Sequence, residues 1–187
     1  MRRLWIPCLL LLAVALPAAA QDDNDHRFEI AGGYFYGRFS FSPRINMNGW
    51  FFQSFVNVSR HASLGGEVDG LYRNVGGVDI SDYLFVFGPR VRLSESERFD
   101  PYIQGLFGAS RVNIGSGGSS VSDTGFAMKI GGGLNISAGR RVSIKVVELN
   151  YILTRHFTVD EPPGSQGANN QNHFGVQTGI VIKLGTP

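Results

Sequence analysis

The chain has 187 residues, enough for one ordinary domain, and it contains 25 glycines, 14 phenylalanines and a single cysteine. Cys8 lies within the N-terminal leader, so the mature chain has no thiol for a disulfide, a zinc site or a nucleophile. Loss of Arg2 and Arg3 with the leader lowers Lys plus Arg from 17 to 15, equal to the 15 Asp plus Glu. This neutral balance argues against a nucleic-acid-binding protein, which would need a basic stripe.

Residues 1–20 have the three parts of a secretory signal peptide. A basic start precedes an apolar run over 4–16, and the small residues 18–20 fit a cleavage site. The apolar run is shorter than the ~20 residues that a membrane-spanning helix needs. We therefore expect a removed signal peptide (1–20), a solvated tail (21–26) and one β-barrel domain (27–185).

Alternation of apolar and polar residues predicts β-strands throughout the mature chain. The pattern is clearest over 126–137, where Phe126 and Ile130 share one face while Ala127 and Lys129 share the other. Comparable runs, in chain order, predict eight strands over 28–39, 50–59, 64–73, 83–93, 101–111, 126–137, 142–153 and 174–184. No amphipathic helical run occurs after residue 21, so the fold class is all-β.

The seventh predicted strand changes phase in its middle. Ile144 and Leu149 are an odd number of positions apart, so in a regular strand their side chains would point to opposite faces, although both are apolar. A β-bulge near Val146-Val147 restores the order and places Lys145 and Glu148 on the polar face.

The connections between the predicted strands alternate in length. Those after strands 1, 3, 5 and 7 are long and irregular, at 40–48, 74–82, 113–123 and 155–172, whereas those after strands 2, 4 and 6 are short. Strands of nearly the ~9–11 residues that span a membrane, joined in this way, predict an antiparallel up-and-down transmembrane β-barrel. Odd strands then run towards the cell exterior.

A soluble eight-stranded carrier is the competing interpretation, because it turns the same apolar face inward. The polar face is poor in charge and rich in Gly, Ser and Asn, which suits a narrow packed interior better than a solvated surface. Apolar-face aromatic residues also gather at the exterior rim, as membrane-interface girdles do. The predicted girdle comprises Tyr36, Trp50, Phe52, Tyr72, Tyr83, Phe85, Phe126 and Phe174.

Charged residues on the polar face form a candidate interior network. Its members are Glu67, Asp69, Arg90, Arg92, Lys129, Lys145 and Glu148, with Glu29 nearer the periplasmic end. Pairing across neighbouring strands predicts Glu67 with Arg90 and Lys129 with Glu148, since an unpaired buried charge is costly. Two interpretations stay open, a salt-bridged plug and a gate that opens to pass ions. The plug is favoured because side chains fill an eight-stranded interior.

Three segments carry a resemblance to a known family. They are 87–92 (Phe-Gly-Pro-Arg-Val-Arg), 101–111 (Pro-Tyr-Ile-Gln-Gly-Leu-Phe-Gly-Ala-Ser-Arg) and 150–155 (Asn-Tyr-Ile-Leu-Thr-Arg). With the leader and the rim pattern, they resemble the OmpA-like and OmpX-like outer-membrane barrels over about residues 27–185. The resemblance implies a bacterial outer-membrane protein whose partners are membrane lipid and the barrel-assembly machinery. It implies a structural role, or an extracellular interaction through the four long loops.

Some barrels of this kind are lipid-modifying enzymes, so an enzyme is a further alternative. The histidines are His26, His61, His156 and His173, and the sequence His156-Phe157-Thr158 differs from the deacylase motif, in which a serine and an asparagine follow the histidine. A catalytic base needs a positioned hydroxyl and a carboxylate orienter. We therefore expect no catalytic residue, no cofactor and no metal.

Overall fold

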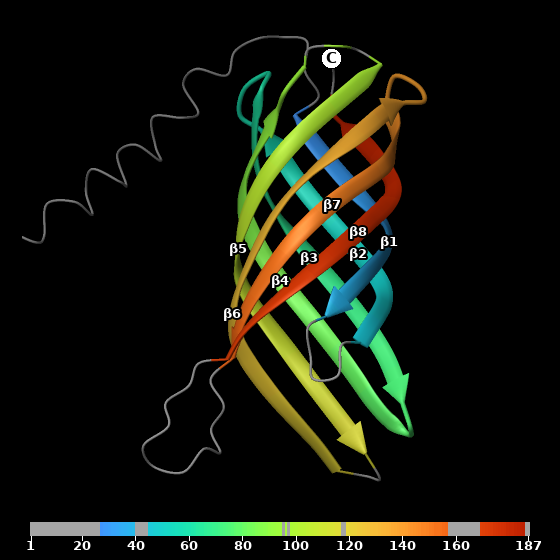
Figure 1. Cartoon of the computed structure of the whole chain (residues 1–187). Helices are drawn as coiled ribbons and strands as arrows, with labels where there is room; N and C mark the ends of the chain where they lie inside the picture. Colours follow the sequence, from blue (N-terminus) through green and yellow to red (C-terminus); the bar gives the residue numbers. More distant parts are fainter. Residues whose placement is uncertain are drawn as a thin grey trace, which may run out of the picture.

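The structure is a computed structural model that describes residues 27–39, 45–94, 96, 98–116, 119–156 and 169–185. The predicted signal peptide and tail lie outside these residues. The described residues form eight antiparallel strands in a closed barrel, in chain order (Figure 1). The strands are β1 (Phe28–Phe39), β2 (Ile45–Asn57), β3 (Ala62–Val75), β4 (Val78–Arg92), β5 (Phe99–Ser116), β6 (Ser119–Ser137), β7 (Val142–His156) and β8 (Asn169–Leu184). The predicted fold class is confirmed.

The barrel closes through pairing of the first strand with the last. β1 is bonded on one side to β2 and on the other to β8, from Phe28 opposite Leu184 to Phe39 opposite His173. Closure removes the free edges at which open sheets pair with other chains. None of the described residues belongs to a helix that is long and apolar enough to cross a membrane.

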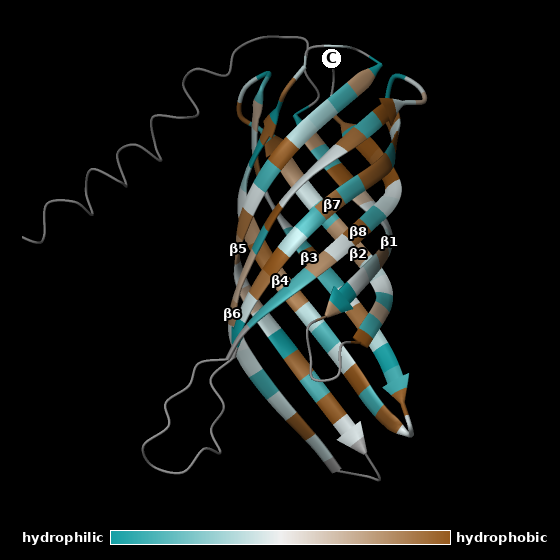
Figure 2. Ribbon diagram, in the orientation of Figure 1, coloured by the Kyte–Doolittle hydropathy of each residue, from teal (hydrophilic) through white to brown (hydrophobic). Residues whose placement is uncertain are grey.

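The apolar side chains of the strands point outward. Ile103, Ile130 and Ile180 are about half exposed, at 51%, 50% and 55%, whereas Lys129 and Lys145 are fully buried. Apolar and polar bands therefore alternate along each strand (Figure 2). This arrangement inverts that of a soluble barrel, whose apolar face fills the interior.

The two ends of the barrel differ. We call the end with the β1–β2, β3–β4, β5–β6 and β7–β8 connections the hairpin rim, and the opposite end, where β1 begins and β8 ends, the turn rim. The β3–β4 and β5–β6 hairpins project at the hairpin rim, at the bottom of Figure 1.

Two predicted loops at the hairpin rim are mostly strand, so these loop boundaries were wrong. β3 runs to Val75 and β4 starts at Val78, so segment 74–82 is a hairpin with a two-residue turn. Gly76 and Gly77 make that turn with φ of 60° and 85°, which suits glycine at both central positions. Segment 113–123 likewise belongs mainly to β5 and β6, which end and begin at Ser116 and Ser119.

The other two long connections are shorter than predicted. β2 begins at Ile45, within the predicted loop 40–48, and residues 40–44 lie outside the described residues. In the predicted loop 155–172, β7 extends to His156 and β8 begins at Asn169, while residues 157–168 are outside the described part.

The predicted bulge in β7 is confirmed. The register of β7 against β8 shifts between Lys145 and Glu148, and its register against β6 shifts at the same level. Because one extra residue is accommodated there, both Lys145 and Glu148 point inward and are fully buried.

Candidate functional site in the barrel interior

The structure places the predicted charged residues inside the barrel. Six of the seven are buried and Arg92 is half-buried; the buried ones are Glu67, Asp69, Arg90, Lys129, Lys145 and Glu148, and Glu29 is buried as well. β-Strand parity, together with the predicted bulge in β7, assigns these positions to one face, so the sequence contained this information.

The ammonium group of Lys129 binds two carboxylates of β3. Its Nζ lies 2.6 Å from Glu67 Oε1 and 2.9 Å from Asp69 Oδ2, and all three side chains are fully buried. The ring of Phe35 lies 4.7 Å from the same nitrogen. Lys129 is on β6, so this ion pair crosses the barrel. The predicted pairing of Glu67 with Arg90 is therefore wrong.

The carboxylate of Glu148 is the centre of a second cluster. Lys145 Nζ and the Tyr102 hydroxyl donate to Oε2, and Gln104 Nε2 donates to Oε1 at 2.9 Å. The predicted pairing of Glu148 with Lys129 is wrong, because Lys145 occupies this position three residues away on the same strand. A buried carboxylate with several donors is satisfied locally and needs no partner from a neighbouring strand.

The guanidinium group of Arg90 lies between two aromatic rings. Its carbon is 3.7 Å from the centre of the Phe55 ring and 4.4 Å from that of Tyr102. It donates to Gln104 Oε1 at 3.0 and 2.8 Å and to Gln53 Oε1 at 2.8 Å. Amides and π-faces therefore stabilise this cation at close range, with the carboxylate of Glu29 more distant at 3.9 Å.

A third cluster lies at the turn rim. Arg92 donates to the carboxylate of Glu29 and to Asn57 Oδ1 at 3.2 Å, and its Nε lies 3.7 Å from Asp100 Oδ1. The charged residues thus form three successive layers from the turn rim towards the middle of the barrel.

Sequence reasoning missed the uncharged members of the network. Gln177 Nε2 donates to Glu67 Oε1 at 2.6 Å and to Asp69 Oδ1 at 3.1 Å, and Gln53 and Gln104 bridge Arg90 to the Glu148 cluster. Their inward parity was readable from the sequence. Their role as bridges was not, because it depends on contacts across the barrel.

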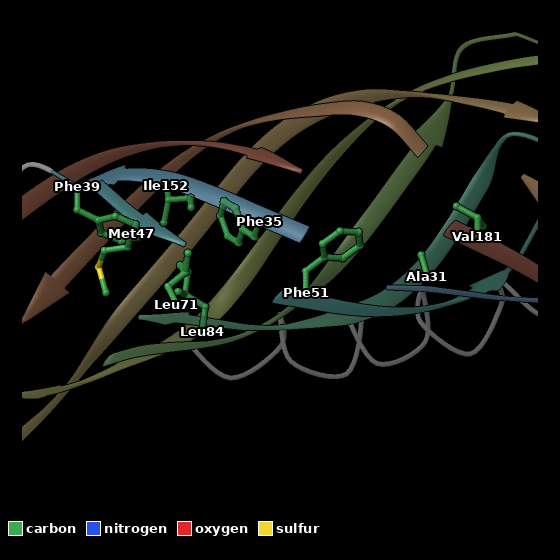
Figure 3. Packing of buried hydrophobic residues seen from close by; sticks show 9 residues of the cluster. All are labelled: Ala31, Phe35, Phe39, Met47, Phe51, Leu71, Leu84, Ile152 and Val181. Atoms are coloured by element: carbon green, nitrogen blue, oxygen red, sulfur yellow. The ribbon is translucent and has the colours of Figure 1, made fainter. Parts of the chain in front are cut away.

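An apolar cluster runs along much of the interior, from Ala31 and Val181 on the side of the turn rim to Phe39 and Met47 at the hairpin rim (Figure 3). It comprises Ala31, Phe35, Phe39, Met47, Phe51, Leu71, Leu84, Ile152 and Val181. Along β3 the buried carboxylates of Glu67 and Asp69 are followed towards that rim by Leu71, and along β7 Glu148 is followed by Ile152. Phe39 and Met47 lie at one end of the cluster, as Figure 3 shows. Apolar side chains therefore pack beside the charged layers, as Phe35 does at Lys129 and Phe51 at Lys145, and they continue towards the hairpin rim.

The eight aromatic residues of the predicted girdle lie on the outer face. Seven are exposed and Tyr83 is half-buried; the exposed ones are Tyr36, Trp50, Phe52, Tyr72, Phe85, Phe126 and Phe174. Three of the polar tips are linked, since Trp50 Nε1 donates to the Tyr72 hydroxyl and this hydroxyl donates to that of Tyr83, both at 3.2 Å.

The histidines do not form a hydrolase arrangement in the described residues. His173 is buried near the hairpin rim, with Nε2 3.0 Å from Thr154 Oγ1 and its ring 4.3 Å from that of Phe39. His61 is exposed in the β2–β3 turn, His156 ends β7, and His26 lies outside the described residues. Within the described residues, no group of three or more His, Cys, Asp or Glu could hold a metal ion.

A closed antiparallel barrel with apolar side chains outside and charges inside defines a membrane β-barrel. The sequence matches the model of the family described as outer membrane protein beta-barrel domain over residues 6–180, and the chain belongs to this family.

Solved structures of outer-membrane barrels have the same fold. Neisserial surface protein A is 12% identical with a TM-score of 0.67, over 84% of this chain and 97% of that chain. Ail, the attachment invasion locus protein of Yersinia pestis, is 15% identical with a TM-score of 0.54, over 84% and 99%. The N-terminal β-barrel domain of Pseudomonas aeruginosa OprF is 12% identical with a TM-score of 0.50, over 84% and 97%. No curated protein matches the chain. At these identities the likeness concerns the fold alone.

Proposed function

We propose that this protein is a non-enzymatic barrel of the bacterial outer membrane with a closed interior, and that its role is structural or an interaction at the hairpin rim. The observation that carries the proposal is the filled interior. Fully buried ion pairs of Lys129 and Lys145 occupy its middle, and the apolar cluster packs beside them and continues to the hairpin rim. Eight-stranded barrels have interiors that side chains can fill.

The orientation follows from the topology. Export by the leader and insertion by the barrel-assembly machinery would place the turn rim, where β1 begins and β8 ends, in the periplasm. The hairpin rim would then face the cell exterior, as the longer connections of such barrels do.

An extracellular partner would meet two projecting hairpins together with segments 40–48 and 155–172. Ile114 and Val121 are cross-strand partners in the β5–β6 hairpin, and they are 44% and 72% exposed. Apolar side chains exposed beyond the barrel favour contact with a partner over a purely solvated hairpin.

A small gated pore is the second candidate function, because the charged layers run from the turn rim to the middle of the barrel. The test is single-channel recording in planar bilayers on the refolded protein and on Lys129→Met. A closed barrel predicts negligible conductance for both proteins, with a heat-dependent gel shift confirming that each has folded. A change in conductance caused by Lys129→Met alone would establish the pore instead.

The non-enzymatic assignment has its own test. Cells that produce the wild-type protein should have the same outer-membrane lipid mass spectrum as cells that produce His173→Ala. A lipid species that depends on His173 would identify a lipid-modifying enzyme.

A further inference from the structure

The outer face of β2 to β5 has an amphipathic surface that the closed interior does not explain. Trp50, Gly70, Tyr83 and Arg111 are directly opposite one another across these four strands and form one row near the hairpin rim. The next two rows away from that rim contain four phenylalanines, Phe52, Phe85, Phe87 and Phe107, among small and apolar residues. We call this surface the β2–β5 patch.

The polar ends of Trp50, Tyr83 and the adjacent Tyr72 lie close together at the hairpin-rim end of the patch. The Trp50 indole lies over Gly70, where a Cβ would be 2.7–2.9 Å from three of its ring atoms, so glycine is needed for this position. The indole donates to Tyr72, and Tyr72 donates to Tyr83. Next to Tyr83 is Arg111, an exposed side chain whose Nη2 lies 3.4 Å from the neutral hydroxyl of Ser122.

Next to this row, on the side away from the hairpin rim, is an open, shallow apolar hollow of about 470 Å³. The side chains around it are Phe52, Val68, Phe85, Phe87 and Phe107. Gly66 lies opposite Phe87 and creates the depth, because its strand position faces outward but has no side chain. A Cβ at Gly66 would be 3.3 Å from Val86 O and 3.6 Å from Phe87 Cδ2, so a larger side chain would enter the hollow after small adjustments.

We propose that the β2–β5 patch is a binding site for one phosphorylated lipid of the outer leaflet. An acyl chain occupies the hollow, the headgroup contacts the tips of Trp50, Tyr72 and Tyr83, and Arg111 binds the phosphate. Guanidinium groups form paired hydrogen bonds to phosphate oxygens, and Trp and Tyr prefer the headgroup level. The site rests on the membrane placement proposed above but not on the closed interior.

A second copy of the chain fits this surface less well. Two barrels inserted in the same direction would be related by an axis along the membrane normal, so each would present the same patch at the same depth. Arg111, at the β5 edge of the patch, would then face the β2 edge of the partner, where this row has Trp50 and no carboxylate to pair with the guanidinium. The outer walls of two barrels are both convex, so the phenylalanine rings of the two patches would meet and leave the hollow in each patch unfilled.

Gly132, on the neighbouring strand β6 and outside the patch, offers a matched control. It also faces outward in mid-strand, opposite Ile103 and Leu149. A Cβ there would be 3.1 Å from Tyr102 O and 3.5 Å from Ile103 Cγ2, a similar degree of crowding to that at Gly66. Gly132 does not line the hollow of the β2–β5 patch.

Trp50 is a built-in reporter for the test. The sequence has two tryptophans, Trp5 and Trp50, and only Trp50 remains in the protein purified from membranes after loss of residues 1–20. The purified protein is placed in phosphatidylcholine vesicles that contain increasing fractions of brominated phosphatidic acid or brominated phosphatidylcholine. Bromine atoms on an acyl chain in the hollow quench the adjacent indole.

We expect half-maximal quenching at an about five-fold lower mole fraction for brominated phosphatidic acid than for brominated phosphatidylcholine, as one exposed ion pair can provide. Arg111→Gln should abolish this preference without changing quenching by phosphatidylcholine. Gly66→Leu should weaken quenching by both lipids, whereas Gly132→Leu should behave as wild type. A heat-dependent gel shift checks that each variant is folded.

The outcomes separate the lipid site from the membrane placement. Equal quenching by the two lipids in the wild type, or a preference that survives Arg111→Gln, overturns the phosphate site. Unchanged quenching in Gly66→Leu overturns the assignment of the hollow. If neither lipid quenches the indole and the protein has a dimeric mass in detergent, a second copy is the occupant. The same absence with a monomeric mass refutes the membrane placement itself.

Discussion

Replacing Lys129 by methionine tests the central ion cluster of the interior. The substitution retains an unbranched chain of similar length but leaves the carboxylates of Glu67 and Asp69 without their cation. Two hydrogen bonds to charged groups, each contributing ~1.5–3 kcal/mol, and the contact with the Phe35 ring are lost. Since breaking a buried ion pair by removing one partner costs ~3–5 kcal/mol, we expect Lys129→Met to lower the free energy of unfolding by about that amount.

The measurement is equilibrium urea unfolding in lipid vesicles, followed by Trp50 fluorescence. In the Lys129→Met background, Glu67→Gln or Asp69→Asn should recover part of the loss, because each removes one stranded carboxylate. The matched control is Glu148→Gln in the same background. It should recover nothing, because Glu148 is held by Lys145 and by the Tyr102 hydroxyl.

Two results would refute this reasoning. One is a cost of Lys129→Met below ~1 kcal/mol, a value typical of an exposed ion pair. The other is recovery by Glu148→Gln that equals the recovery by Glu67→Gln, which would restore the pairing across neighbouring strands.

The remaining predictions concern the two faces of the barrel. Ile130→Arg, at mid-strand on the outer face, should cost ~2–4 kcal/mol in the same unfolding assay, whereas Val142→Arg at the turn rim should cost at most ~1 kcal/mol; equal costs would reject the depth assignment. Gln104→Ala should cost ~1–3 kcal/mol, since it leaves a buried guanidinium and a buried carboxylate each short of a partner, and a negligible loss would argue against the bridging role. Gly70→Leu should displace the Trp50 indole and shift its emission maximum, and an unchanged spectrum would contradict the packing of the ring over the glycine.

Strand periodicity was sufficient to predict the barrel. The alternation in 126–137 and the phase change in β7 correctly assigned the inward residues, including Lys145 and Glu148 on either side of the bulge. Side-chain direction in a strand follows parity, with one phase change at each bulge, and both are visible in a single sequence.

The ends of the hairpins were harder to predict. Segment 113–123 is rich in Gly and Ser, which usually indicate a loop, yet β5 and β6 continue through most of it. Turn-forming residues do not prevent strand pairing when a hairpin has already begun and backbone hydrogen bonds can continue along it.

The ion pairs could not be predicted from neighbouring strands. Lys129 reaches Glu67 and Asp69 from β6 to β3, so the contact passes through the interior rather than along the sheet. Register between adjacent strands fixes which residues lie beside one another on the wall. It does not fix which long side chains meet across the barrel, because that depends on the volumes of all the inward side chains together.

The bonding of β1 to β8 determines when this protein can become stable. Phe28 is in the first strand of the barrel and Leu184 in the last, so their pairing has to follow the arrival of all eight strands. Until then two strands present unpaired N–H and C=O groups, which in hydrocarbon cost several kcal/mol each. A partly assembled barrel therefore cannot gain stability strand by strand within the bilayer. The search for the final pairing has high contact order and is slow, so the open form persists until β8 pairs with β1.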